Sequence, residues 1–143
     1  MRIHRLAGRG QLDFQYRALL RFGEMYRQGG VIDGKRVLPE SWVKESWQPK
    51  TASPFTGDRY GYGWYMRDMD VHTVYYAWGF GGQMIYVAPS LDMTVVMTSD
   101  STEPSREGDY IGQLHALVAE SIIPALLSDQ TEATGSIAPA PIP

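Results

Sequence analysis

The chain has 143 residues, of which 43% are hydrophobic and 20% are charged, a composition typical of one globular domain with its own core. A net charge of -3 gives no reason to expect nucleic acid or an anionic membrane as a partner. The chain has no cysteine, which excludes disulfides and thiolate metal sites but leaves the localisation unknown. No apolar run approaches the roughly 18 residues of a membrane span, and no secretory signal is expected.

The first half of the chain predicts two helices separated by a hairpin. Apolar residues recur at helical spacing over residues 14–28, and two glycines follow. Residues 31–38 place an Asp-Gly pair between two apolar pairs, which is the strongest short signal for a β-hairpin. Pro39 suits the first position of a helix, so residues 40–47 predict a short helix that carries two tryptophans.

The second half predicts an antiparallel sheet of about four strands. After a loop over residues 48–59, strands are expected at 60–66, at 71–78 and in the run 75–99, which are rich in Val, Ile, Tyr, Thr and Met. Residues 109–127 carry apolar residues on one face and predict a C-terminal amphipathic helix. The fold class is therefore α+β, an antiparallel sheet packed by an N-proximal helix and a C-terminal helix.

The C-terminal end of this predicted helix contains Pro124, which is expected to end or bend it. Residues 128–143 are low in large apolar residues and rich in Pro, Ala, Thr and Ser, so they predict a disordered tail. The predicted domain is thus residues 1–127.

Three glycines, Gly79, Gly81 and Gly82, lie inside the strand-rich run. Glycine within a strand usually marks a bulge, or a place where another backbone or a ligand comes close. Residues 77–83 are therefore the best candidate for the wall of a site.

A literal S-x-x-K sequence occurs at Ser41 and Lys44. In penicillin-recognising serine enzymes this motif supplies a nucleophile and its lysine partner, because a serine near a helix N-terminus meets a lysine one turn later. A serine and a lysine on a short surface helix need no function, however, and this spacing arises readily by chance. We treat Ser41 and Lys44 as a decoy rather than as the catalytic pair.

Other chemical motifs are weaker still. The three histidines have no metal-ligand spacing to one another, so neither a metal nor a cofactor is expected. Asp68 and Asp70 are interpreted as turn residues. The glycines after Trp78 do not form a dinucleotide loop, because a strand is expected to follow them rather than a helix.

Four segments, residues 10–23, 29–43, 60–64 and 76–99, follow one another in an order that resembles the C-terminal part of the class C β-lactamase-like serine hydrolases. This family includes β-lactamases, D-alanyl-D-alanine peptidases, esterases and hydrolases of 6-aminohexanoate oligomers. The resemblance covers residues 7–125. It implies a partial β-lactamase/transpeptidase-like fold without the family's N-terminal strands and helical domain.

The resemblance also implies site residues. The family's strand element K-T-G or H-x-G corresponds to Ala77, Trp78 and Gly79, and the backbone N–H of Phe80 corresponds to one donor of the oxyanion hole. A backbone donor can bind a developing oxyanion whatever its own side chain is, and Gly79 would let a substrate approach.

Two departures from the family pattern bear on activity. Ala77 stands at the position where the family's K-T-G or H-x-G element has Lys or His. Related sequences with a small residue at this position resemble esterases or amidases. The nucleophile motif S-x-x-K and the motif Y-x-N belong to the family's N-terminal half, and none of the nine tyrosines here is followed two residues later by Asn.

Three functional hypotheses remain. In the first, the chain is the C-terminal lobe of a serine hydrolase that acts on small-molecule amides or esters, and it is inactive alone. In the second, it is a non-catalytic module whose exposed sheet edge pairs with a second copy or with an upstream N-terminal polypeptide. In the third, it is an enzyme that uses Ser41 and Lys44.

Overall fold

The computed structural model describes residues 10–99 and 109–135, and the chain divides into two compact units, residues 1–104 and 105–143. The described elements of the first unit are α1 (Gly10–Arg27), β1 (Val31–Ile32), β2 (Lys35–Arg36), α2 (Glu40–Ser46), β3 (Thr51–Ala52), β4 (Arg59–Tyr60), β5 (Tyr65–Met69), β6 (His72–Gly79), β7 (Gln83–Ala88), η1 (Pro89–Leu91) and β8 (Met93–Met97). Those of the second unit are α3 (Tyr110–Leu117), the π-helical turn η2 (Val118–Ile122) and α4 (Ile123–Gly135).

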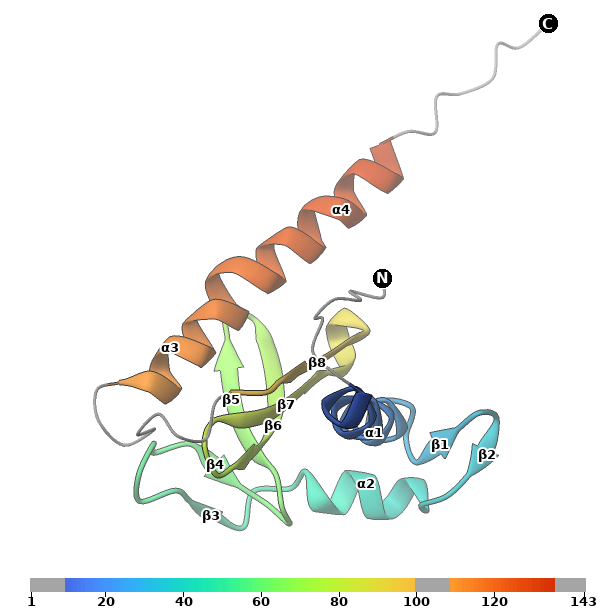
Figure 1. The fold of residues 1–143 in the computed structure, drawn as a ribbon, viewed down its shortest axis with the longest axis vertical. Helices are drawn as coiled ribbons and strands as arrows, with labels where there is room; N and C mark the ends of the chain where they lie inside the picture. The colour runs from blue at the N-terminus through green and yellow to red at the C-terminus, as the bar shows by residue number, and fades with distance from the viewer. Residues whose placement is uncertain (1–9, 100–108, 136–143) are drawn as a thin grey trace, which may run out of the picture. The chain divides into compact units, whose positions relative to one another are not determined.

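The first unit is built on a six-stranded antiparallel sheet in the order β3-β4-β5-β6-β7-β8 (Figure 1). Each strand pairs with the next one along the chain, so the sheet is a meander, and the predicted α+β class and antiparallel pairing are confirmed. The prediction of about four strands was too low. Two short strands, β3 and β4, lie wholly or partly within residues 48–59, which were expected to form a loop.

The predicted strand at residues 60–66 is mostly a turn. Gly61 donates its N–H to the carbonyl of Trp64 at 2.9 Å, and Gly63 has a φ of +80°, a conformation that favours glycine. A Cβ on Gly61 would overlap the carbonyl oxygen of Ser46. The glycines therefore fold the chain back between β4 and β5 and let it pass close to α2.

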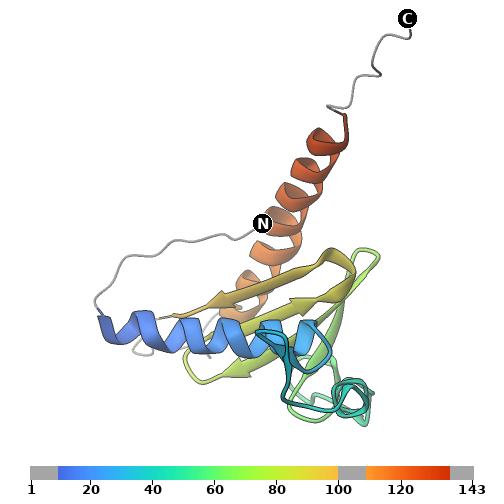
Figure 2. The ribbon, with the colours of Figure 1, turned by 90° about the vertical axis from the view of Figure 1, so that its right-hand side faces the viewer.

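Helix α1 lies across one face of this sheet (Figure 2). Its Gly23 allows the approach, because a Cβ there would lie 2.7 Å from the methyl of Thr94 and 2.9 Å from a methyl of Ile85. The predicted packing of the sheet by an N-proximal helix is confirmed. The core between helix and sheet consists of six buried side chains, Met25, Tyr26, Val43, Trp64, Ile85 and Val87.

Aromatic rings fill part of this core. Tyr26 and Trp64 have ring centroids 4.8 Å apart, and Trp47 lies edge-on to Trp64 at 6.1 Å. Trp47 also stacks on Tyr75 of β6, with centroids 4.0 Å apart and planes 11° apart. Such pairs add to the free energy gained by burying the rings, and they fix the segment after α2 to the sheet.

The predicted hairpin forms as expected. Val31 pairs with Arg36 and Ile32 with Lys35. The two residues between the strands have positive φ, 50° for Asp33 and 75° for Gly34. Positive φ at both central residues is the geometry of a type I′ turn, which Asp-Gly favours.

The second unit is one continuous helical rod of α3, η2 and α4. The wide turn η2 ends shortly before Pro124, whose missing N–H cannot join the regular α-helical ladder. The helix continues beyond the proline to Gly135, so residues 128–135 of the predicted disordered tail are helical. Residues 136–143 of that prediction lie outside the described residues.

Among the described residues, the stretch Tyr110–Thr131 is the one helix long and apolar enough to cross a membrane by length and composition, with a mean hydropathy of 1.4. No membrane-spanning stretch was expected from the sequence. Glu120 and Asp129 are its only acidic residues, and it contains no lysine or arginine. Core helices of globular proteins have the same composition, so this property alone assigns no membrane role.

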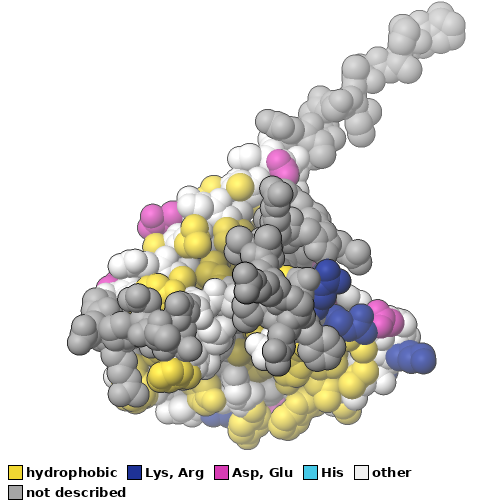
Figure 3. Space-filling view, viewed as in Figure 1, with side chains coloured by type: hydrophobic (Ala, Val, Ile, Leu, Met, Phe, Trp, Pro, Cys, Tyr) yellow, Lys and Arg dark blue, Asp and Glu magenta, His cyan; other side chains and the backbone are white. Residues whose placement is uncertain are grey.

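Hydrophobic side chains remain visible on the surface of the molecule, notably along the lower part of the view in Figure 3. Exposed large apolar residues of the first unit include Phe22, Trp42, Tyr62 and Phe80. Trp42 and Tyr62 stack with planes 3° apart, which connects α2 to the turn before β5.

Candidate functional site

The end of β6 is open on one side. The ladder between β5 and β6 stops at the pair Tyr65–Tyr76, whereas the ladder between β6 and β7 continues to the pair Gly79–Gln83. The segment from Ala77 to Gly79 therefore extends beyond β5, and no described strand pairs with its outer edge. An unpaired edge presents backbone donors and acceptors to a ligand or to another chain.

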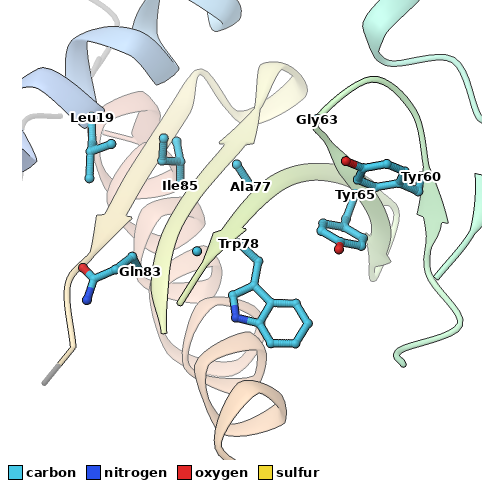
Figure 4. Close-up of a pocket in the computed structure, with 9 residues that line it drawn as sticks. Leu19, Tyr60, Gly63, Tyr65, Ala77, Trp78, Gln83 and Ile85 are labelled. Atoms are coloured by element: carbon cyan, nitrogen blue, oxygen red, sulfur yellow. The ribbon is translucent and has the colours of Figure 1, made fainter. Parts of the chain in front are cut away.

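A pocket of about 310 Å³ lies at this open end, within the first unit (Figure 4). This volume is at the lower end of the usual range of small-molecule sites, roughly 300–1,000 Å³. The described residues that line it come from α1, the β4–β5 region, β6 and β7: Leu19, Tyr60, Gly63, Tyr65, Ala77, Trp78, Gly79, Gln83 and Ile85.

The pocket wraps around the end of β6. Ala77 and Ile85 face each other across the β6–β7 ladder on the side of α1, while Trp78 and Tyr65 turn their rings to the other side (Figure 4). The alternation of side chains along a strand dictates this division. The ring of Tyr65 lies 4.6 Å from that of Tyr60 and 6.3 Å from that of Trp78, so the three rings form one continuous aromatic surface.

Gly79 is not required by the fold. Its φ is not in the left-handed region, and a Cβ added to it would meet only Gln83, at 3.4 Å, which is an ordinary contact. Gly23 and Gly61, in contrast, are held against neighbouring atoms. The missing side chain at Gly79 therefore leaves open space at the pocket rather than room for the protein's own packing.

The β6–β7 turn is held in place beside the pocket. Gly81 and Gly82 have φ values of 73° and 76°, and Gln83 Nε2 donates to the carbonyl of Ser99 at 2.8 Å. The hydroxyl of Ser99 in turn donates to the carbonyl of Gly82 at 3.0 Å. Phe80, at the start of this turn, is 81% exposed and is not among the pocket-lining residues. Its side chain adds nothing to the pocket, which leaves only its backbone available for the predicted role.

The lining residues carry no charge at neutral pH. Burial raises the pKa of the Tyr65 hydroxyl, so this group stays protonated. The nearest basic residue in sequence, Arg59, donates to Asp68 at 2.8 Å. The pocket is thus uncharged, and the arginine next to Tyr60 already has an acidic partner.

The pair Ser41 and Lys44 lies elsewhere, on α2, which contributes no residue to the pocket. Both side chains are exposed, and Lys44 Nζ forms an ion pair with Glu40 Oε1 at 2.6 Å, which lowers the pKa of that carboxyl group. The Lys44 ammonium group is therefore engaged by a carboxylate of its own helix. The geometry gives this pair no catalytic surroundings.

Sequence reasoning missed Leu19, Tyr60, Tyr65 and Ile85 as pocket residues. The Y-G-Y-G-W run that begins at Tyr60 was the one signal available, since its glycines indicate close approach. Among the described residues no three metal-binding side chains cluster together.

A contact between His72 Nδ1 and Ser90 Oγ, at 3.0 Å, was also not foreseen. His72 begins β6 and Ser90 lies in η1, so both residues lie toward the other end of the β6–β7 hairpin. Neither residue lines the pocket. The pair therefore belongs to a different part of the sheet from the candidate site.

The candidate site is thus a pocket at the open end of β6, in an antiparallel meander that carries a helix on one face. A model of the Beta-lactamase family matches residues 8–120, which is most of the chain, and the chain therefore belongs to this family of serine hydrolases. A search of curated proteins gave no match.

Proposed function

We propose that this chain provides the substrate-binding wall and one oxyanion-hole donor of a serine hydrolase that cleaves small amides or esters. The observation that carries the proposal is the pocket at the open end of β6. Ala77, Trp78 and Gly79, which correspond to the family's substrate-binding strand, line this pocket together with side chains from three other elements.

The proposed chemistry assigns one role to each residue of the wall. A substrate carbonyl lies against Gly79, where the missing side chain leaves room for it. The N–H of Phe80 donates to the oxygen of that carbonyl and stabilises the negative charge that develops there when the nucleophile attacks. Ala77 and Trp78 contact the rest of the substrate.

The nucleophile is proposed to come from outside these 143 residues. The one S-x-x-K sequence in the chain lies on α2, which contributes no residue to the pocket, and the chain contains no Y-x-N. An oxyanion donor without a nucleophile retains only weak catalysis. The isolated chain should therefore hydrolyse esters no faster than a denatured control.

A fluorophosphonate probe tests this part of the proposal, because it labels activated serines covalently. We expect no stoichiometric labelling of the chain by intact-mass spectrometry. Stoichiometric labelling would refute the assignment, and the variants Ser41→Ala and Ser90→Ala would then show which serine reacts. Ser90 is included because its hydroxyl lies beside His72.

The oxyanion donor is tested by joining the chain to a polypeptide that bears the S-x-x-K and Y-x-N motifs of a family member. In the resulting enzyme, Phe80→Pro removes the N–H and should lower kcat by about 10²–10³. Phe80→Ala keeps the N–H and changes an exposed ring, so it should leave kcat almost unchanged. Equal losses in the two variants would argue against the donor.

The alternative function, an assembly module, is supported by β8. This five-residue strand, Met93–Met97, is the last in the sheet, and no described strand pairs with its outer edge. An apolar edge of this length can accept another strand, from a second copy or from a partner polypeptide. Size-exclusion chromatography with light scattering distinguishes the cases, since a monomer at all concentrations excludes pairing between copies.

A further inference from the structure

The charge of the pocket lining determines which ligands it can hold. We propose that the pocket selects a neutral substrate with a small aromatic group and rejects one with a free carboxylate. This inference rests on the proposed function of the wall and specifies its substrate class. Its basis is the set of described lining residues, none of which is ionised at neutral pH.

The aromatic part of the substrate is defined by three rings. Tyr60, Tyr65 and Trp78 lie in series, and Tyr65 additionally stacks on Tyr76 with centroids 4.9 Å apart. This stack holds the Tyr65 ring in place. A planar ligand ring can therefore pack against a preorganised surface, where offset and edge-on contacts between aromatic rings are favourable.

The part of the lining on the other face of the sheet is aliphatic. Leu19 from α1 and Ile85 from β7 lie on the helix side of the sheet with Ala77 (Figure 4). With a volume of about 310 Å³, the space suits one ring and a short linker rather than an extended chain. Gln83 is the one lining side chain with an amide, and its Nε2 already donates to the carbonyl of Ser99.

A carboxylate in this pocket would lose its hydration without gaining a cation. Arg59, the basic residue adjacent to the lining, is bound to Asp68, and Lys50, which precedes β3, is paired with Glu45. Burying an unpaired carboxylate is strongly unfavourable. A neutral amide or ester of similar shape does not incur this cost, so charge alone separates the two ligands.

The position of Ala77 makes the inference testable. Its methyl lines the pocket, and a lysine in its place would bring an ammonium group to the site without altering any existing charge pair. Val71 provides a matched control, since it is 83% exposed and lies in the β5–β6 turn, at the opposite end of β6 from Gly79. Val71→Lys therefore changes the net charge of the chain as Ala77→Lys does, but away from the pocket.

The test measures binding of phenylacetamide and of phenylacetate to the full 143-residue chain by ligand-observed NMR titration at neutral pH. We expect phenylacetamide to bind at least about tenfold more tightly than phenylacetate. Ala77→Lys should reverse this preference, because the ammonium group pairs with the carboxylate. Val71→Lys should retain the preference of the native chain.

Gln83→Lys is a second cationic variant at the pocket, in case Ala77→Lys does not fold as judged by circular dichroism. Equal binding of the two ligands to the native chain would overturn this inference and leave the proposed function standing. An unchanged preference in a folded lysine variant would overturn it as well. If neither ligand binds the native chain, both this inference and the proposed binding wall fail.

Discussion

The packed core of the first unit and the open end of β6 use glycine in opposite ways. In the packed core, Gly23 brings α1 against Thr94 and Ile85, and Gly61 brings the β4–β5 turn against the backbone of Ser46. At the open end, Gly79 has only an ordinary contact distance to its neighbour across the ladder. A glycine required for packing contributes to stability, whereas a glycine that the fold does not require leaves space that a ligand can use.

The same contrast holds for tryptophan. Trp64 is 2% exposed and lies among Phe22, Tyr26 and Trp47, so its indole is part of the core. Trp78 is half-buried and borders the pocket. The two residues have the same side chain, but one indole is enclosed by the core and the other borders the pocket.

The largest expected effect is the loss of stability in Trp64→Ala. Removing this indole deletes the centre of the aromatic core and should lower the free energy of unfolding by about 3–5 kcal/mol. Trp78→Ala should cost much less, since its ring already contacts solvent. Urea unfolding followed by circular dichroism measures both variants, and similar losses would remove the distinction between the packed core and the pocket.

Gly61→Ala should have the next largest effect. The new methyl would overlap the carbonyl oxygen of Ser46, which is a backbone atom and cannot rotate away. We expect a loss of about 1–3 kcal/mol in the free energy of unfolding. The measurement is again a urea titration, and an unfolding midpoint equal to that of the native chain would show that the turn can shift without cost.

Local signals were sufficient for the elements whose geometry depends on a few neighbouring residues. Asp33 and Gly34 specified their turn, and helical periodicity specified α1. Residues 61–64 were misassigned as part of a strand, because Gly61 serves a contact with Ser46 that is distant in sequence. Residues 128–135 were misassigned because the helix continues beyond Pro124.

The candidate site was only partly accessible from sequence for the same reason. Glycine content drew attention to residues 77–83, and the structure places Ala77, Trp78 and Gly79 at a pocket. Leu19 and Tyr60 join them through the folding of α1 and β4 onto the sheet, which no local pattern specifies. The catalytic role of this segment stays a prediction.

Gly79→Ala tests the contrast between the packed core and the pocket with a smaller change. Because the added methyl meets Gln83 at an ordinary distance, the free energy of unfolding should stay within about 0.5 kcal/mol of the native value. The methyl would nevertheless occupy part of the pocket and weaken phenylacetamide binding. A stability loss as large as that of Gly61→Ala would show that Gly79 is structural after all.

The smallest expected effect concerns the acid stability of the ion pair between Glu24 and Arg27 on α1. Glu24 accepts a hydrogen bond from Arg27 at 2.7 Å, and this bond lowers the pKa of the Glu24 carboxyl below its ordinary value of 4.5. Because the pKa is lower in the folded state, the pair stabilises the fold above the unfolded-state pKa, and this contribution is lost as the pH falls through the folded-state pKa. Glu24→Gln should cost about 0.3–0.5 kcal/mol at pH 7 and flatten the acid limb of the stability curve.

Urea midpoints measured between about pH 7 and pH 3 test the assignment of this acid dependence to Glu24. Glu40→Gln is the matched comparison, because Glu40 also has a lowered pKa, through Lys44, but lies on the exposed surface of α2. Water and salt screen an exposed pair, so its removal should change the acid limb less. If Glu40→Gln flattens the curve more than Glu24→Gln does, the acid dependence does not arise at the junction of α1 with the sheet.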